Sequence, residues 1–275
     1  MQSIPPLAEI LPFVLGLVAA GAVAGFLAGL FGIGGGAVLV PVFYQMLTAL
    51  GFDPAITMHL SVGTSLAIIV PTSLQSFSKH KARGVVDMSV LRSFLIPVPL
   101  GVICASIVTA FLSGASLRVI FAVIAFVLAL KLLFARDNWR LGNDLPGGAG
   151  RGFAGWLIGF FSTFMGIGGG IMNNTFMTLY GRPMHQAVAT SAGVGVLISI
   201  PGALGYVWAG WGVSGLPSLS FGFVNLMAIA VIIPLTLLIT PLGVRLAHAL
   251  SRRQLEIAFG LFLLFVSFRF FASLF

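Results

Sequence analysis

The sequence predicts an all-α polytopic membrane protein with two inverted repeats, each a glycine-broken helical hairpin followed by three transmembrane helices. Three observations support this fold class. Of the 275 residues, 59% are hydrophobic and 7% are charged, whereas soluble domains carry about 25% charged residues. Long apolar runs recur from one end of the chain to the other. The pentapeptide Gly-Ile-Gly-Gly-Gly stands inside two apolar regions, at 32–36 and 166–170.

The apolar runs give the elements in order. A transmembrane helix needs about 20 apolar residues. Long runs predict helices at 10–31, 56–78, 93–115, 117–134, 186–208, 217–244 and 254–272, and shorter runs lie at 37–51, 152–165 and 171–181. The polar, glycine-rich stretch 135–151 reads as a linker. The expected organisation is therefore a first repeat at 1–134, a cytoplasmic linker at 135–151 and a second repeat at 152–275.

The charge pattern and the cysteine content limit which binding partners and cofactors are expected. The 14 Lys and Arg residues outnumber the 6 Asp and Glu residues, but they stand singly or in small groups between apolar runs, as in membrane loops. We therefore expect the lipid bilayer as a partner and no nucleic acid. The single cysteine, Cys104, excludes an intrachain disulfide and a cysteine-rich metal site. No metal and no cofactor is expected. No cation precedes the first apolar run, so the N-terminal segment is not read as a secretory signal.

Matching segments indicate an internal duplication. The segment 24–36 resembles 154–170, Val-Gly-Thr-Ser at 62–65 resembles Val-Ala-Thr-Ser at 188–191, and Pro-Leu-Gly occurs at 99–101 and again at 241–243. These segments follow the same order in both halves. Weak internal similarity of this kind is typical of transporters with structural repeats.

The distribution of cations orients the halves. Lys and Arg gather on cytoplasmic loops. If each glycine-broken segment enters the membrane and returns to its starting side, Arg118 and Arg269 are the only outward cations, whereas counting each segment as one crossing places more of them outside. Arg151 and Arg182 then bracket the second hairpin on the cytoplasmic side. This topology inverts the halves and places both termini outside. The longer first arm, 10–31, leaves open that it crosses the membrane by itself.

The repeated glycines suit a substrate site. Irregular backbone survives at membrane depth only when it is buried in protein or lines a cavity, and glycine permits the positive φ of a tight turn. The helix that follows begins with free N–H groups and a positive partial charge, which favour an anion. Close helix packing is the alternative, although a packing stripe does not need three consecutive glycines. The candidate anion-binding glycines are Gly34, Gly35, Gly36, Gly168, Gly169 and Gly170.

Polar side chains in apolar helices extend the candidate site. Asn173 and Asn174 follow the second glycine motif, and buried amides are unfavourable unless they are paired. The first half has apolar residues at the equivalent positions, 38–40, so the site is expected to be asymmetric. Thr64–Ser65 recurs as Thr190–Ser191 in the second half. We interpret both pairs as substrate contacts, with hydrogen bonds back to the helix as the alternative.

These motifs resemble those of the TauE/SafE family, which is named for sulfite export. The resemblance rests on GIGGGAVLVPVF (32–43), VGTSLAIIV (62–70), GIGGGIMNNTF (166–176) and VATSAGVGV (188–196). It implies a multi-pass transporter of the bacterial inner membrane for small sulfur-containing or carboxylate anions, such as sulfite and sulfonates. Many relatives carry a proline-bearing apolar run after the second glycine motif, where this chain has Met-Asn-Asn-Thr. That difference bears on the identity of the substrate.

The function expected from the sequence is secondary transport of a small anion by alternating access, with the anion bound near the midplane. A passive anion channel is the alternative. An intramembrane enzyme fits less well, because the histidines and acids lie near loops and no nucleophile–base pair stands at membrane depth. No catalytic residue is therefore assigned. The sequence leaves open whether two copies associate as a homodimer.

Overall fold

The computed structural model describes residues 7–31, 36–134, 140–142 and 144–274. The first half contains α1 (Leu7–Phe31), α2 (Gly36–Ala49), α3 (Pro54–Ala82), α4 (Met88–Phe94), α5 (Pro97–Phe111) and α6 (Gly114–Phe134). The second half contains α7 (Gly148–Met165), α8 (Gly170–Leu179), α9 (Met184–Ala209), β1 (Ser220–Phe221), β2 (Val224–Asn225), α10 (Leu226–His248) and α11 (Arg252–Ala272).

The lengths of the helices confirm an all-α polytopic membrane protein. Within the described ranges, six helices are long and apolar enough to cross a membrane: α1, α3, α6, α9, α10 and α11. The bent pair α4–α5 adds a seventh span if it is counted as one. α7 has 18 residues and α8 has 10. At a rise of about 1.5 Å per residue, each helix is shorter than the ~30 Å thickness of the hydrocarbon core. α1 passes the length test, so the first arm is long enough to span alone.

Sequence signals at the helix ends explain several boundaries. α3 begins with Pro54 at its first position, and the side chain of Asp53 accepts a hydrogen bond from Ala55 N at 2.8 Å. Ser251 and Gln254 form a reciprocal capping box at the start of α11. Pro97 begins α5, and the chain bends by 42° between α4 and α5, because proline cannot donate to the preceding turn.

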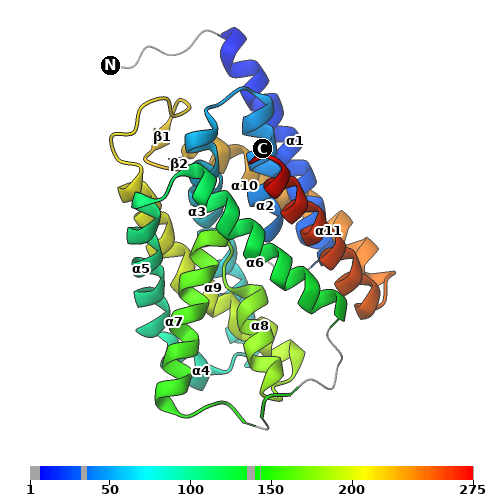
Figure 1. Cartoon of the computed structure of the whole chain (residues 1–275). Coiled ribbons are helices and arrows are strands. Elements are labelled where there is room, and N and C mark those ends of the chain that lie inside the picture. The colour runs from blue at the N-terminus through cyan, green and yellow to red at the C-terminus, as the bar shows by residue number, and fades with distance from the viewer. Residues whose placement is uncertain (1–6, 32–35, 135–139, 143, 275) are drawn as a thin grey trace.

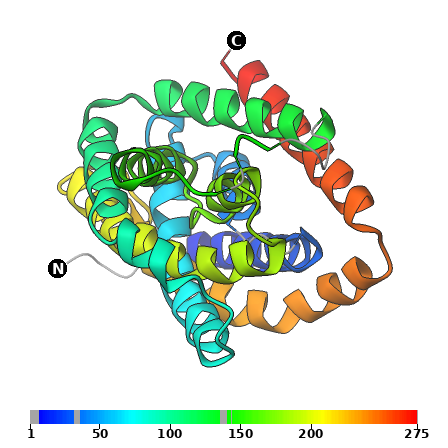
Figure 2. The same ribbon diagram turned by 90° about the horizontal axis from the view of Figure 1, so that it is seen from below.

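The helices pack in matched pairs from the two halves. α3 packs against α9, and α6 packs against α11. Each hairpin arm crosses to the other half, since α1 lies along α10 and α7 lies along α5. In Figure 1, α1 begins at the top of the molecule, while α7 begins at the bottom and rises toward the centre. Seen from below, α7 and α8 lie inside a ring of α5, α6, α11 and α10 (Figure 2).

The outer surfaces of this ring are apolar. Phe111 on α5, Leu238 on α10 and Phe268 on α11 are more than two-thirds exposed, at 84%, 74% and 73%. Large exposed apolar areas mark contact with lipid or with other apolar partners. The buried side therefore faces the hairpins, and the exposed side of the ring suits the acyl chains of a bilayer.

Two local features differ from the sequence prediction. The predicted run 217–244 is not one helix, because β1 and β2 form a short antiparallel pair with Gly222 between them at φ 52°, and α10 begins at Leu226. Asn225 caps that helix by accepting from Ala228 N at 2.8 Å. In the second half, α7 begins at Gly148, inside the segment expected to be linker.

Candidate functional site

The second glycine motif forms the turn between α7 and α8. Gly166 ends α7 at φ 62°, and Gly169 precedes α8 at φ 70°. Both values lie in the left-handed region that glycine enters without steric cost. A Cβ atom on Gly169 would also lie 2.5 Å from Ile198 Cδ1. The backbone conformation therefore favours glycine at this position, and an added Cβ atom would require the Ile198 side chain to shift.

This turn presents unpaired backbone donors. The first backbone hydrogen bond into α8 runs from Asn173 N to Gly169 O at 2.8 Å, and no side chain caps the helix. The N–H groups of residues 168–172 have no acceptor among the described residues. Free N–H groups at a helix start carry a positive partial charge. The turn can therefore donate several hydrogen bonds to an anion.

The first glycine motif meets the second one. α2 begins at Gly36, and a Cβ atom there would lie 2.7 Å from Gly166 O and 2.9 Å from Ile167 Cα. The two motifs are thus in backbone contact, although they stand far apart in the sequence. The predicted site residues Gly34 and Gly35 lie outside the described residues.

A small cavity, here called the polar cavity, adjoins the second turn. Its volume is about 130 Å³. Its polar lining comes from α3, α8 and α9, and none of the described residues that line it is charged. The lining residues are Ile69, Thr72, Ser73, Ser76, Gly168, Gly170, Asn174, Val188, Ser191, Ala192 and Gly195.

A network of amides and one hydroxyl forms a wall of the polar cavity. Asn173 Nδ2 donates to Ser191 Oγ at 2.7 Å, and Ser191 Oγ donates to Asn174 Oδ1 at 2.7 Å. Asn173 is fully buried, and its Oδ1 has no hydrogen-bond partner in the described structure. Because Ser191 occupies Asn174 Oδ1, the amide N–H₂ of Asn174 is left as the group that can donate into the cavity.

The other predicted hydroxyls hold the backbone around the site. Ser65 Oγ donates to Gly166 O at 2.8 Å and so anchors the glycine turn to α3. Thr64 Oγ1 accepts from Asn225 N at 3.1 Å. Thr190 Oγ1 donates to Gln186 O at 2.8 Å and accepts from Asp87 N at 2.9 Å. Of the two predicted pairs, Ser191 is the member that lines the polar cavity.

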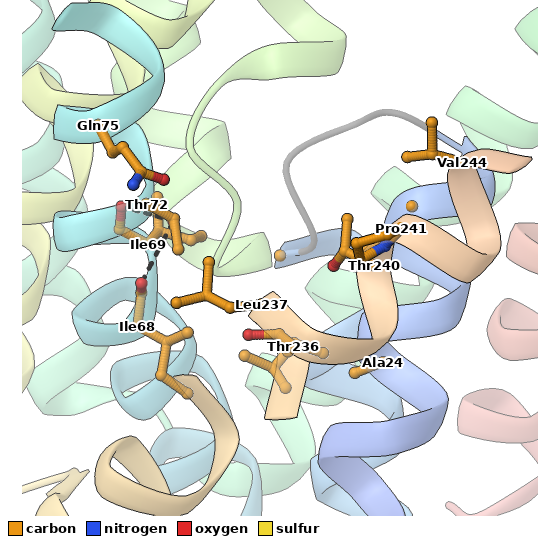
Figure 3. Close-up of a pocket in the computed structure, with 14 residues that line it drawn as sticks. Ala24, Ile68, Ile69, Thr72, Gln75, Thr236, Leu237, Thr240, Pro241 and Val244 are labelled. Carbon is orange, nitrogen blue, oxygen red and sulfur yellow. Dashed lines mark hydrogen bonds between the residues drawn. The ribbon is translucent and has the colours of Figure 1, made fainter. Parts of the chain in front are cut away.

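A second, larger cavity is lined by residues of α1, α2, α3 and α10 and is here called the apolar cavity. Its volume is about 370 Å³. Its lining is mainly apolar and includes the start of α2 at Gly36, and Ile69 and Thr72 line both cavities. In Figure 3, Leu237 of α10 extends toward Ile69 and Thr72 of α3. The lining residues are Ala24, Ala28, Gly29, Gly36, Leu39, Ile68, Ile69, Thr72, Gln75, Thr236, Leu237, Thr240, Pro241 and Val244.

Comparison with known proteins agrees with this architecture. Residues 17–270 match the family model described as Sulfite exporter TauE/SafE. The chain belongs to the TauE/SafE family. The resemblance drawn from the glycine and Thr-Ser motifs is therefore confirmed.

Named relatives place this TauE/SafE chain among membrane transporters. A "Probable membrane transporter protein" of Haemophilus influenzae is 32% identical over 256 residues, which cover 93% of this chain and 97% of the relative. A relative of that description from Methanocaldococcus jannaschii is 26% identical over 88% of this chain and 89% of its own length. The Bacillus subtilis protein YunE, also so described, is 29% identical over 70% of this chain and 78% of its own. No solved structure matches the chain significantly.

These matches decide the broad class of function. The chain is a multi-pass membrane protein of a transporter family and is not an enzyme. The family membership leaves substrate and mechanism to the site itself.

Sequence reasoning missed the contribution of α3 beyond Ser65. Thr72, Ser73 and Ser76 line the polar cavity of this TauE/SafE protein. Ser65, Thr72 and Ser76 share one helical face with Ile69, since their spacing follows the helical period. The helical spacing of these hydroxyl residues could have indicated their shared face from the sequence. It is weak, because hydroxyls in apolar helices commonly bond back to their own backbone, as Ser73 Oγ does to Ile69 O at 2.7 Å.

A third cavity of about 330 Å³ adjoins the polar cavity through Asn174 and Val188, which line both. Lys131 at the end of α6 lines it, and Lys131 Nζ donates to Thr175 Oγ1 of α8 at 3.0 Å. Glu256 of α11 lines the same cavity. Lys131 therefore brings a positive charge close to the second hairpin, a role that its position in the sequence alone did not indicate.

Proposed function

We propose that this TauE/SafE protein is a secondary transporter that binds a small anion in the polar cavity, against the second glycine turn. The binding groups are the N–H groups of residues 168–172 and the amide N–H₂ of Asn174, which Ser191 orients by donating to Asn174 Oδ1. The observation that carries the proposal is that unpaired N–H groups follow the glycine turn and that two residues of this run, Gly168 and Gly170, line a cavity with neutral polar walls.

The free energies of desolvation and of hydrogen bonding indicate that several donors have to act together. Removing an anion from water costs several kcal/mol. One helix N-terminus returns up to ~2 kcal/mol, and each hydrogen bond to a charged group returns about 1.5–3 kcal/mol. A helix end alone is therefore insufficient, so the proposed site also uses the individual N–H groups of the turn and the amide of Asn174. A volume of about 130 Å³ suits a compact oxyanion such as sulfite or the head of a sulfonate or short carboxylate.

The arrangement of the halves supports alternating access. Helices α1 and α7 start at opposite ends of the molecule (Figure 1), and their glycine motifs meet at Gly36 and Gly166. We interpret this as an inverted pair of repeats with the site at their contact, as in other transporters with repeats. Rocking of one half against the other would then expose the polar cavity first to one side and then to the other.

The polar cavity lies toward the α4 end of the molecule. The polar cavity is lined by the second half of α3 and the first half of α9, which lie toward α4 at the bottom of Figure 1. On the opposite side, His59 stacks on Phe223 at 4.8 Å, and Phe223 N donates to Tyr206 O at 3.1 Å. This packing would close the side away from α4, and we propose an inward-facing state in a bacterial inner membrane with the linker cytoplasmic and both termini outside.

The test is uptake of sulfite and methanesulfonate by purified protein in proteoliposomes. Asn174→Asp keeps the shape of the side chain and places a negative charge at the site, so we expect uptake to fall at least tenfold. Ser78→Asp adds the same charge at an exposed position of α3 and should leave uptake unchanged. Equal uptake by both variants would contradict the site, and single-channel currents would assign the passive channel instead.

A further inference from the structure

The Thr-Ser motifs belong to a longer repeated segment. Residues 58–65 read Met-His-Leu-Ser-Val-Gly-Thr-Ser, and residues 184–191 read Met-His-Gln-Ala-Val-Ala-Thr-Ser, so five of the eight positions are identical. The segments lie in α3 and α9, the long helices that follow the two glycine motifs. Because Thr64 matches Thr190, each residue of α3 has a counterpart in α9 that lies 126 positions further along the chain.

The paired histidines of this segment differ in exposure. His59 is 3% exposed, and its ring stacks on that of Phe223 at 4.8 Å. Phe223 N in turn donates to Tyr206 O near the end of α9. The counterpart of His59 is His185, which is exposed at the start of α9. Equivalent residues are therefore buried at one end of the α3–α9 pair and open at the other.

The lining of the polar cavity also has a buried counterpart. On α3 and α9 this lining contains Ile69, Thr72, Ser73, Ser76, Val188, Ser191, Ala192 and Gly195, and half of these residues are partly exposed. Their counterparts, here called the outer set, are Gly195, Ile198, Ser199, Gly202, Val62, Ser65, Leu66 and Ile69, all of which are buried. Ile69 and Gly195 belong to both sets, so the outer set continues the polar cavity toward His59.

Unpartnered polar atoms mark this buried region. Ser199, the counterpart of Ser73, is fully buried, and its Oγ has no hydrogen-bond partner in the described structure. The same holds for Tyr206 OH, Ser106 Oγ of α5 and His59 Nδ1. Buried polar groups without partners are unfavourable. Water that entered between α3, α5 and α9 would satisfy them, so they favour a second state in which this side is open.

Glycines allow this side to close tightly. A Cβ atom on Gly63 would overlap Phe223 O, and one on Gly205 would overlap Ser106 Oγ. These contacts join α3 and α5 of the first half to α9 and the following turn of the second half. They are packing contacts between the halves, so they can separate when one half rocks against the other.

We propose that the outer set is the closed outer part of the anion pathway, and that His59 and His185 exchange exposure during transport. In the present state His185 lies at the open inner mouth and His59 at the closed outer mouth. When the outer side opens, His59 and Ser199 become accessible to water, and His185 becomes buried as His59 is here. This inference rests on the proposed transport function and adds the residues of the outer route.

The test measures how fast diethyl pyrocarbonate modifies each histidine of the full-length protein in lipid nanodiscs, with mass spectrometry to locate the modified residue. In the wild type, His185 should react and His59 should be protected. Gly63→Val prevents tight closure of the outer side, so His59 should react about tenfold faster and His185 about tenfold more slowly. Gly152→Val, where a Cβ atom meets nothing within 4 Å, should leave both rates unchanged.

Phe223→Ala opens the same side by another route. Loss of the stacked ring exposes His59 directly, so the informative residue is His185, at the opposite end of the 26-residue helix α9. Slower modification of His185 in this variant and in Gly63→Val supports the exchange. A rate at His185 that is unchanged or faster in both variants overturns it.

A single cysteine tests whether Ser199 lines the outer route. In a Cys104→Ser background, Ser199→Cys should react with a membrane-impermeant thiol reagent about tenfold faster when Gly63→Val is also present. Ser267→Cys is the matched control, because Ser267 is 1% exposed but its Oγ donates to Ala122 O at 2.8 Å. It should stay unreactive in both backgrounds. Equal rates for Ser199→Cys with and without Gly63→Val would place the outer route elsewhere.

The outcomes separate this inference from the proposed function, because the labelling needs no anion. Binding of sulfite to a protein whose histidines do not exchange exposure would overturn the inference alone. Reciprocal exposure of His59 and His185 in a protein that binds neither sulfite nor methanesulfonate would overturn the anion site and support the exchange.

Discussion

The hydroxyl of Ser65 donates a 2.8 Å hydrogen bond to the carbonyl oxygen of Gly166. This bond joins the Thr-Ser motif of the first half to the glycine motif of the second half. Both groups are buried, so the carbonyl has no alternative partner in water. The two motifs that the sequence repeats are thus physically coupled across the halves.

Ser65→Ala tests that coupling. The variant leaves Gly166 O buried without a donor, which costs about 1–3 kcal/mol, and it frees the turn from α3. We expect a lower thermal unfolding temperature and slower transport. Ser78→Ala, at an exposed position of the same helix, should change neither. Wild-type stability in Ser65→Ala would contradict the role given to this hydrogen bond.

Gly36→Val tests the contact between the two turns. Its side chain would overlap Gly166 O and Ile69 Cδ1, each 2.7 Å from the added Cβ atom. Overpacking of this kind costs about 1–3 kcal/mol and should push the turns apart, so transport is lost while the protein still inserts. Gly152→Val, where a Cβ atom meets nothing within 4 Å, serves as the control. Uptake and membrane insertion are measured in parallel, and normal uptake by Gly36→Val would refute the contact's importance.

Ser191→Ala and Thr190→Ala should have different effects, although the residues are adjacent. Ser191 links the two asparagines at the polar cavity, so its loss should weaken anion binding about tenfold. Thr190 supports the backbone at Asp87, so its loss should lower stability by about 1 kcal/mol and leave affinity unchanged. Binding isotherms and thermal unfolding on each variant separate the two effects. The reverse pattern would show that the network is structural.

Lys131→Gln tests the charge in the third cavity. Lys131 holds Thr175, the neighbour of Asn174, and faces the cavity that adjoins the site. Removing its charge should raise the KM for anion uptake several-fold at low ionic strength. The difference should shrink at high salt, because ions screen the attraction. Lys79→Gln, an exposed cation at the end of α3, is the control. A KM equal to that of the wild type at both salt concentrations would remove Lys131 from the pathway.

The helices could largely be predicted from the sequence, because a bilayer demands long apolar runs. α3, α6, α9 and α11 begin and end within a few residues of the predicted runs. The second glycine turn was also predictable, since two of its glycines adopt positive φ. β1 and β2 could not be predicted, because the apolar pattern around Phe223 is compatible with both a helix and a buried hairpin.

The partners of the polar side chains could not be predicted. Asn173 and Asn174 were identified as costly amides in an apolar helix, but their link through Ser191 depends on how α8 packs against α9. The different roles of Thr190 and Ser191 likewise depend on which neighbour each hydroxyl faces. Tertiary contacts of this kind leave no local pattern, whereas glycine turns and apolar runs do.

Anion binding at the second glycine turn is tested most directly by a crystal structure of the protein with selenite, an anomalously scattering analogue of sulfite. We expect an anomalous peak in the polar cavity, within hydrogen-bond reach of the N–H groups of residues 168–172 and of the Asn174 amide. A peak beside Lys131 in the third cavity, with none at the glycine turn, would contradict it.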